Sequence, residues 1–242
     1  MRFRALILFS TLAFAMPVFA HEVEEEEEEE KPLTGNIKLG YLATSGNTET
    51  KTMNFGAEAT YTLERWVHAA KLSAIYAEDD SLTTAEAYEA SWRSDWKLTD
   101  RDSIFGRLNW RKDRFGGFDT QFSQSLGWGR NILTGPTHIL NGDLGAGARQ
   151  SEDQLGVETN EFIIAAGLDY TWQFTELSDF QQTFVFEIGE ENTYSESVSS
   201  LSTTIIGAFR LIASYTIRHN SDVPIGTEKR DTRTAISLEY NF

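Results

Sequence analysis

Apolar residues recur at every second position along most of the chain from Leu33 to Phe242. A period of two is that of a β-strand whose faces meet different surroundings. In residues 88–98, for example, aromatic and apolar residues alternate with charged or small polar ones. We expect about twelve strands, built around residues 37–43, 53–63, 70–76, 88–98, 104–110, 122–128, 140–148, 162–172, 180–188, 201–206, 211–217 and 234–242.

The alternation alone leaves open which row of side chains is buried. A soluble sandwich or lipocalin would bury the apolar row and leave the polar row in water. Expected strand lengths of about 9 to 12 residues instead suit a tilted crossing of a bilayer. Aromatic residues near the row ends match the two membrane–water interfaces; they are Tyr76, Tyr88, Trp96, Trp110, Trp128, Trp172 and Tyr240. The pattern therefore favours an all-β, antiparallel transmembrane β-barrel over residues 33–242.

The expected connections alternate in length, as in bacterial outer-membrane barrels. Short turns are expected at 64–65, 99–102, 174–179 and 207–210, with a somewhat longer one at 131–137. Longer polar loops are expected at 78–87, 150–159, 190–197 and 220–231. An even number of strands places both ends of the barrel on the periplasmic side, beside the short turns.

The N-terminus has the features of an export signal. Arg2 and Arg4 precede the apolar stretch 5–14, and the small-residue pattern ending at Ala20 is typical of a cleavage site. We expect a signal peptide at 1–20, with a short buried helix as the alternative. Within residues 21–32, the run from Glu22 to Glu30 is almost all glutamate. Residues 21–32 predict a disordered periplasmic tail, because like charges repel one another and the run has almost no apolar surface to bury. This tail is interpreted as a solvated spacer, and weak binding of cations or of a basic partner is the alternative.

The amino-acid composition argues against several classes of function. The 242 residues include no cysteine, which excludes disulfides, cysteine-ligated metal sites and thiol catalysis. The formal net charge of −16 gives no support to nucleic-acid binding. No run of 18 apolar residues occurs, so a helical membrane span is not expected. The mean hydropathy of −0.37 still suits a barrel, because only half of its strand residues face lipid.

The chain ends on an aromatic residue in an amphipathic strand. Leu238, Tyr240 and Phe242 lie on the apolar row of this strand. The ending resembles the C-terminal signal read by the outer-membrane barrel assembly machinery. The expected partners are therefore outer-membrane lipids, this machinery, and small solutes or ions.

Three stretches also resemble a known family. They are Gly40-Tyr41 followed by residues 44–49 (TSGNTE), residues 215–222 (YTIRHNSD), and the ending LEYNF. Together they are similar to the YdiY-like, salt-induced outer-membrane proteins, over essentially residues 33–242. The resemblance implies an outer-membrane barrel linked in some members to salt or osmotic stress. It implies no reaction and no catalytic residues.

No catalytic motif, cofactor site or metal site is expected. The chain lacks HExxH, a P-loop and a Rossmann fingerprint. His219 and Ser221 resemble the residue types of outer-membrane phospholipases, which need the base within hydrogen-bond reach of the hydroxyl. Close neighbours on one strand do not by themselves make that geometry. We interpret residues 219–222 as an interface histidine and a turn.

The polar row carries charges of both signs that are expected to line the lumen: Glu58, Lys71, Glu89, Arg93, Asp95, Lys97, Arg107, Arg111, Asp143, Arg149, Asp169 and Glu187. Unpaired buried charge is costly, so these groups should pair or stay hydrated. Full pairing would plug the lumen, whereas partial pairing would leave a narrow polar channel. The open hypotheses are a narrow passive channel, a closed structural or stress-protective barrel, and, more remotely, a lipid-modifying enzyme.

Overall fold

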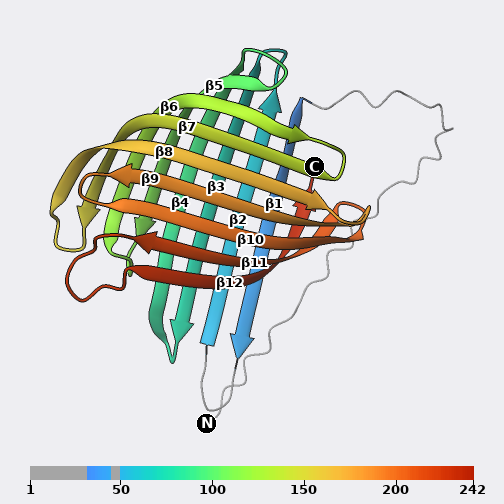
Figure 1. Cartoon of the computed structure of the whole chain (residues 1–242). Coiled ribbons are helices and arrows are strands. Elements are labelled where there is room, and N and C mark those ends of the chain that lie inside the picture. The colour runs from blue at the N-terminus through green and yellow to red at the C-terminus, as the bar shows by residue number, and fades with distance from the viewer. Residues whose placement is uncertain (1–31, 45–49) are drawn as a thin grey trace, which may run out of the picture. The chain divides into compact units, whose positions relative to one another are not determined.

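The computed structural model describes residues 32–44 and 50–242, which form one closed antiparallel barrel of twelve strands (Figure 1). Each strand pairs with its neighbours in the chain, and β12 closes the barrel against β1. The strands are β1 (Leu33–Thr44), β2 (Thr50–Thr62), β3 (Trp66–Asp79), β4 (Leu82–Lys97), β5 (Asp102–Asp113), β6 (Phe118–Thr134), β7 (His138–Asp153), β8 (Glu158–Gln173), β9 (Ser178–Gly189), β10 (Thr193–Ile206), β11 (Phe209–Asn220) and β12 (Arg230–Asn241). The predicted fold is confirmed.

Several sequence-based expectations fall outside the described residues. They are the signal peptide at 1–20, all of the tail at 21–32 except Pro32, and most of the motif at 44–49. Within the described part of the chain, no helix is long and apolar enough to cross a membrane.

The strands are longer than expected, and the loops are correspondingly shorter. Strand lengths run from 12 to 17 residues, against the expected 9 to 12. The expected long loop at 78–87 is wrong: β3 and β4 meet in a tight turn at Asp80 and Ser81, both with positive φ. Such a turn continues the twist of the strands, but it lacks the usual Asn-Gly signal. The connections at 154–157 and 190–192 are also short, whereas 221–229 is long as expected.

The apolar rows cover the outside of the barrel. Leu126 and Leu39 retain 71% and 60% of their exposure, whereas the inward Arg149 is fully buried. A soluble protein would have the opposite distribution. Aromatic side chains gather on this outer face near the ends of the strands. Trp66 packs edge-on against Trp96 across β3 and β4, as expected of a membrane interface.

The seam between β1 and β12 is short. The two strands pair only where residues 36–39 face residues 238–241, and Gly35 and Phe242 exchange two backbone hydrogen bonds. The Phe242 ring packs on Gly35, where an added Cβ would lie 2.6 Å from Phe242 Cζ. β1 and β2, by contrast, pair along the whole length of β1. Toward their other ends β1 and β12 separate (Figure 1).

Candidate functional site: a charged lumen

Small side chains on the inner face of β6 make room inside the barrel. Ser123, Ser125, Gly127 and Gly129 follow one another along this face. They allow long side chains from β4 and β5 to pass over β6 and reach β7 and β9. Gly127 also faces Gly145 of β7, and the fully buried Phe105 ring lies against both glycines.

Asp143 of β7 joins two arginines from β4 and β5. Arg93 and Arg107 both donate to Asp143 Oδ1, and Arg93 also pairs with Asp95 at 2.8 Å between Nε and Oδ2. The two guanidinium carbons lie 4.2 and 4.9 Å from the centroid of the Phe105 ring. Both guanidinium groups are therefore held by a carboxylate and by an aromatic ring.

A second cluster surrounds Glu187 of β9. Arg111 of β5 approaches both of its oxygens at 3.3 Å, and Arg149 of β7 approaches Oε2 at 3.4 Å. Arg149 also donates to Glu161 of β8 and to the backbone carbonyl of Asn192. Three strands separate β5 from β9, so the Arg111–Glu187 pair crosses part of the lumen.

A chain of contacts continues from this cluster across the barrel. Arg111 stacks 4.0 Å above the Tyr194 ring of β10, and the Tyr194 hydroxyl donates to Glu196 at 2.9 Å. Arg218 of β11 lies 2.5 Å from Glu196 and 2.5 Å from Glu89 of β4. Four strands separate β4 from β11 along the shorter arc of the wall. The Glu89–Arg218 pair therefore bridges opposite walls of the barrel.

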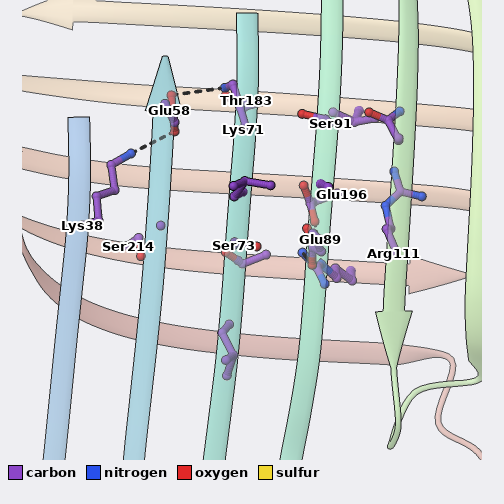
Figure 2. A pocket seen from close by; sticks show the side chains of 18 of the residues that line it. Lys38, Glu58, Lys71, Ser73, Glu89, Ser91, Arg111, Thr183, Glu196 and Ser214 are labelled. Atoms are coloured by element: carbon purple, nitrogen blue, oxygen red, sulfur yellow. Dashed lines mark hydrogen bonds and ion pairs between the residues drawn. The ribbon is translucent and has the colours of Figure 1, made fainter. Parts of the chain in front are cut away.

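The walls of β1, β2 and β3 carry a looser arrangement. Glu58 lies between two lysines, 3.1 Å from Lys38 and 3.5 Å from Lys71 (Figure 2). Lys38 also lies 3.4 Å from Glu239 of β12. Arg210 of β11 forms ion pairs both with Glu239 and with Asp179 of β9.

The two sides of the lumen differ sharply in exposure. On β7, β8 and β9, the side chains of Arg149, Glu161 and Glu187 retain 0%, 5% and 3% of their exposure. On β2 and β3, the inward side chains of Glu58 and Lys71 retain 35% and 62%. One half of the interior is therefore packed with ion pairs, and the other half is open to water.

A cavity of about 460 Å³ lies in the lumen and is lined by residues of β1–β5 and β8–β12. Lys38, Glu58 and Lys71 line it from β1 to β3, while Glu196 and Ser214 approach it from β10 and β11 (Figure 2). Ion pairs and hydroxyl groups of both walls thus surround a hydrated space.

The structure places the residues expected in the lumen on both sides of this division. Seven of the twelve line the cavity: Glu58, Lys71, Glu89, Arg93, Arg107, Arg111 and Asp169. Asp95, Asp143, Arg149 and Glu187 belong to the packed clusters. Lys97 lies at the end of β4 and is exposed. Further inward charges that the sequence reasoning did not single out are Lys38, Glu161, Asp179, Glu196, Arg210, Arg218, Arg233 and Glu239, all of which follow from the same alternation.

The turns at the end opposite the termini pack on one another. An added Cβ on Gly117, between β5 and β6, would lie 2.8 Å from Val223 of the loop at 221–229. Gln154, between β7 and β8, donates to the backbone carbonyls of Asp113 and Gly116. These contacts connect the loop between β11 and β12 to turns on the opposite side of this mouth.

His219 and Ser221 are not linked by a hydrogen bond in the described part of the chain. The Ser221 hydroxyl oxygen accepts a hydrogen bond of 2.8 Å from the backbone N–H of Thr193. The same hydroxyl donates to Asn192 Oδ1. His219 lies exposed on the outward row of β11. Ser221 thus joins two neighbouring turns. Residues 32–44 and 50–242 contain no cluster of three or more potential metal ligands.

Comparison with known proteins places this barrel in a family. The family model described as "Protein of unknown function, DUF481" matches residues 37–242. The chain belongs to the DUF481 family. One relative is the uncharacterized protein YdiY of Escherichia coli K12, which is 33% identical over 224 residues, covering 91% of this chain and 87% of YdiY.

A solved structure shares the fold of this DUF481 chain. The COG4313 outer membrane channel from Pseudomonas putida F1 is 11% identical, with a TM-score of 0.53, over 91% of this chain and all of the channel. At this identity the likeness concerns the fold alone. The apolar outer surface of the barrel is that of a protein surrounded by lipid.

Proposed function

We propose that the protein is a passive outer-membrane channel whose narrow, water-filled path lies off the centre of the barrel, along β1–β3. The exposure of Lys71 carries this proposal. Lys71 points inward from the middle of β3, yet it retains 62% of its side-chain exposure. Because the outside of the wall faces lipid, this exposure reflects water inside the lumen.

The path selects solutes by size, and its wall carries charges of both signs. Positive and negative groups alternate from strand to strand along its wall, as Lys38, Glu58, Lys71 and Glu89. An alternating wall leaves little net field, so weak selectivity between anions and cations is expected. The solutes are small and polar, since the packed half of the lumen narrows the passage.

A closed structural barrel is the second candidate, and the Glu89–Arg218 bridge favours it. The bridge spans the lumen, and the loop at 221–229 reaches across one mouth. If these contacts block every path, the ion pairs serve stability alone. The two candidates differ in whether water and ions pass the bridge.

Single-channel recording in planar bilayers tests the proposal. Full-length protein folded in detergent is expected to give discrete current steps smaller than those of a wide general porin. Protein denatured by boiling is the matched control and should give none. Folded protein that inserts into the bilayer without current steps would refute the channel and favour the closed barrel.

Export and assembly complete the proposal. We propose that residues 1–20 are removed as a signal peptide, that residues 21–32 lie in the periplasm, and that the assembly machinery reads the last strand through Leu238, Tyr240 and Phe242. Support comes from the sequence pattern and from the outward, exposed position of these three side chains. A link to salt stress rests on the family resemblance, and protein levels at low and high salt test it.

A further inference from the structure

Arg233 is an inward arginine without an ionic partner. It lies on the inner row of β12, lines the cavity and is half-buried. Among the described residues it makes no ion pair or side-chain hydrogen bond, unlike Arg93, Arg107, Arg111, Arg149, Arg210 and Arg218. A guanidinium that is partly removed from water without an acceptor is unfavourable, so this group is available for a ligand.

Its nearest carboxylates are held elsewhere or lie apart. Asp231 lies two residues away on the same face and stands opposite Arg218 in the register. It does not come within ion-pair distance of Arg233. Arg218 itself forms ion pairs with Glu89 and Glu196. The carboxylates of this region, Glu89, Glu196, Asp113 and Asp231, therefore act on Arg233 only from beyond ion-pair distance, and its guanidinium has no direct acceptor among the residues that the structure describes.

Two free hydroxyl groups adjoin Arg233. Thr216 stands directly opposite on β11, and Ser214 is the next inward residue of that strand. Both line the cavity, and neither side chain has a hydrogen-bond partner in the described ranges 32–44 and 50–242. Figure 2 shows Ser214 at the pocket. A guanidinium with neighbouring neutral donors suits an oxyanion, because its fork matches carboxylate and phosphate geometry.

Arg233 lies near the mouth of the barrel at the end opposite the termini. Pairing between β1 and β12 stops at Leu39 and Leu238, whereas Arg233 lies five residues further along β12. The loop at 221–229, meanwhile, reaches across the mouth toward Gly117. Arg233 is the second inward residue of β12 after this loop, so a solute entering at this mouth meets it.

We propose that Arg233, with Thr216 and Ser214, forms an oxyanion-binding site in the lumen, which takes a carboxylate or phosphate group entering from the mouth opposite the termini. The proposal deepens the channel function by assigning small anions as solutes that bind on their way. Either a free solute or an anionic lipid headgroup carries the required group.

Binding of inorganic phosphate to the folded full-length protein tests this site without requiring conductance. Phosphate binding is measured in an uncharged detergent by ³¹P line broadening. Arg233→Gln is expected to weaken binding about tenfold, since hydrogen bonds to charged groups are among the stronger ones. Lys97→Gln is the matched control, because it removes the same charge from the inward row outside the cavity, and it should bind like the wild type.

Equal binding by the wild type and Arg233→Gln would overturn the site, and so would equal weakening by both variants. A heat-dependent gel shift in each variant confirms that it is folded. Competition by phosphatidylglycerol in nanodiscs would identify the lipid as the source, whereas its absence identifies a free solute. Phosphate binding that depends on Arg233 in a barrel that passes no current would refute the channel and keep the site. Current without such binding would refute the site and keep the channel.

Discussion

Glu89 and Arg218 form an ion pair across the lumen, with 2.5 Å between Glu89 Oε1 and Arg218 Nη2. Their strands, β4 and β11, lie on opposite walls. The pair braces the barrel and narrows the path beside it. Because Arg218 also pairs with Glu196, it neutralises two carboxylates in the interior.

Arg218→Gln should weaken this brace. Two partly buried carboxylates lose their partner, and the free energy of unfolding is expected to fall by about 2 kcal/mol. The passage should widen, so the single-channel conductance should rise and shift toward cations. Urea titration and bilayer recording measure the two effects. Unchanged conductance together with unchanged stability would show that the bridge neither braces nor narrows the barrel.

Arg107→Ala together with Arg111→Ala should make the lumen cation-preferring. In the structure these arginines neutralise Asp143 and Glu187, so their removal leaves negative charge. The reversal potential in a salt gradient measures the shift. Leu108→Arg is the control from the outward row. It should hinder insertion, because arginine near the bilayer midplane costs roughly 2–4 kcal/mol.

A different outcome of these experiments would show that the inward and outward faces of β5 are the reverse of those described. If Leu108→Arg inserts normally and Arg107→Leu does not, the inward row on this strand has been assigned wrongly. Every contact argued for Arg107 and Arg111 would then be incorrect.

The fold follows from the sequence because a period of two is a local property. The alternation places Trp92 and Arg93 on opposite faces, and the strand lengths and the aromatic row ends indicate that the apolar row with Trp92 faces outward. The same rule assigns Lys38 and Arg218 inward. The turn at Asp80 and Ser81 was missed because its positive φ values occur at residues without the usual turn signal. Both strands consequently extend beyond their expected ends.

The contacts inside the lumen do not follow from the sequence in the same way. Which charges meet depends on the stagger of all twelve strands around the barrel and on where small residues leave space. Arg93 reaches Asp143 over β5 and β6 because Gly129 offers no side chain in its path. The sequence predicts that Arg107 lines the lumen but does not identify Asp143 as its partner.

Gly127→Val should destabilise the barrel. A Cβ at Gly127 would lie 2.7 Å from Phe105 Cε1 and 2.6 Å from Gly145 Cα, so ring and backbone must both shift. Overpacking of this kind costs about 1–3 kcal/mol. The folded fraction on an unboiled gel at increasing temperature measures the loss. Gly207→Ala, where an added Cβ meets nothing within 4 Å, tests the backbone effect alone at a turn with φ of 52°.

Phe242→Asp should impair assembly. Phe242 lies on the outward row, packs on Gly35 and completes the short seam. A carboxylate there faces lipid and removes the terminal aromatic, so reduced insertion and periplasmic degradation are expected. Outer-membrane levels by immunoblot measure the effect. Deletion of residues 24–30 is the control and should be tolerated, whereas normal levels of Phe242→Asp would refute an assembly role.

The division of the lumen into a hydrated half and a packed half is tested most directly by two serine-to-cysteine variants. Ser73 lines the cavity from β3, whereas Ser123 of β6 is buried and donates to Glu187 at 2.8 Å. The chain has no other cysteine, so a water-soluble, charged thiol reagent can modify only the introduced residue. During single-channel recording, the reagent should reduce the current of Ser73→Cys sharply and leave Ser123→Cys unchanged. Block of Ser123→Cys with Ser73→Cys unaffected would contradict a water-filled path along β1–β3.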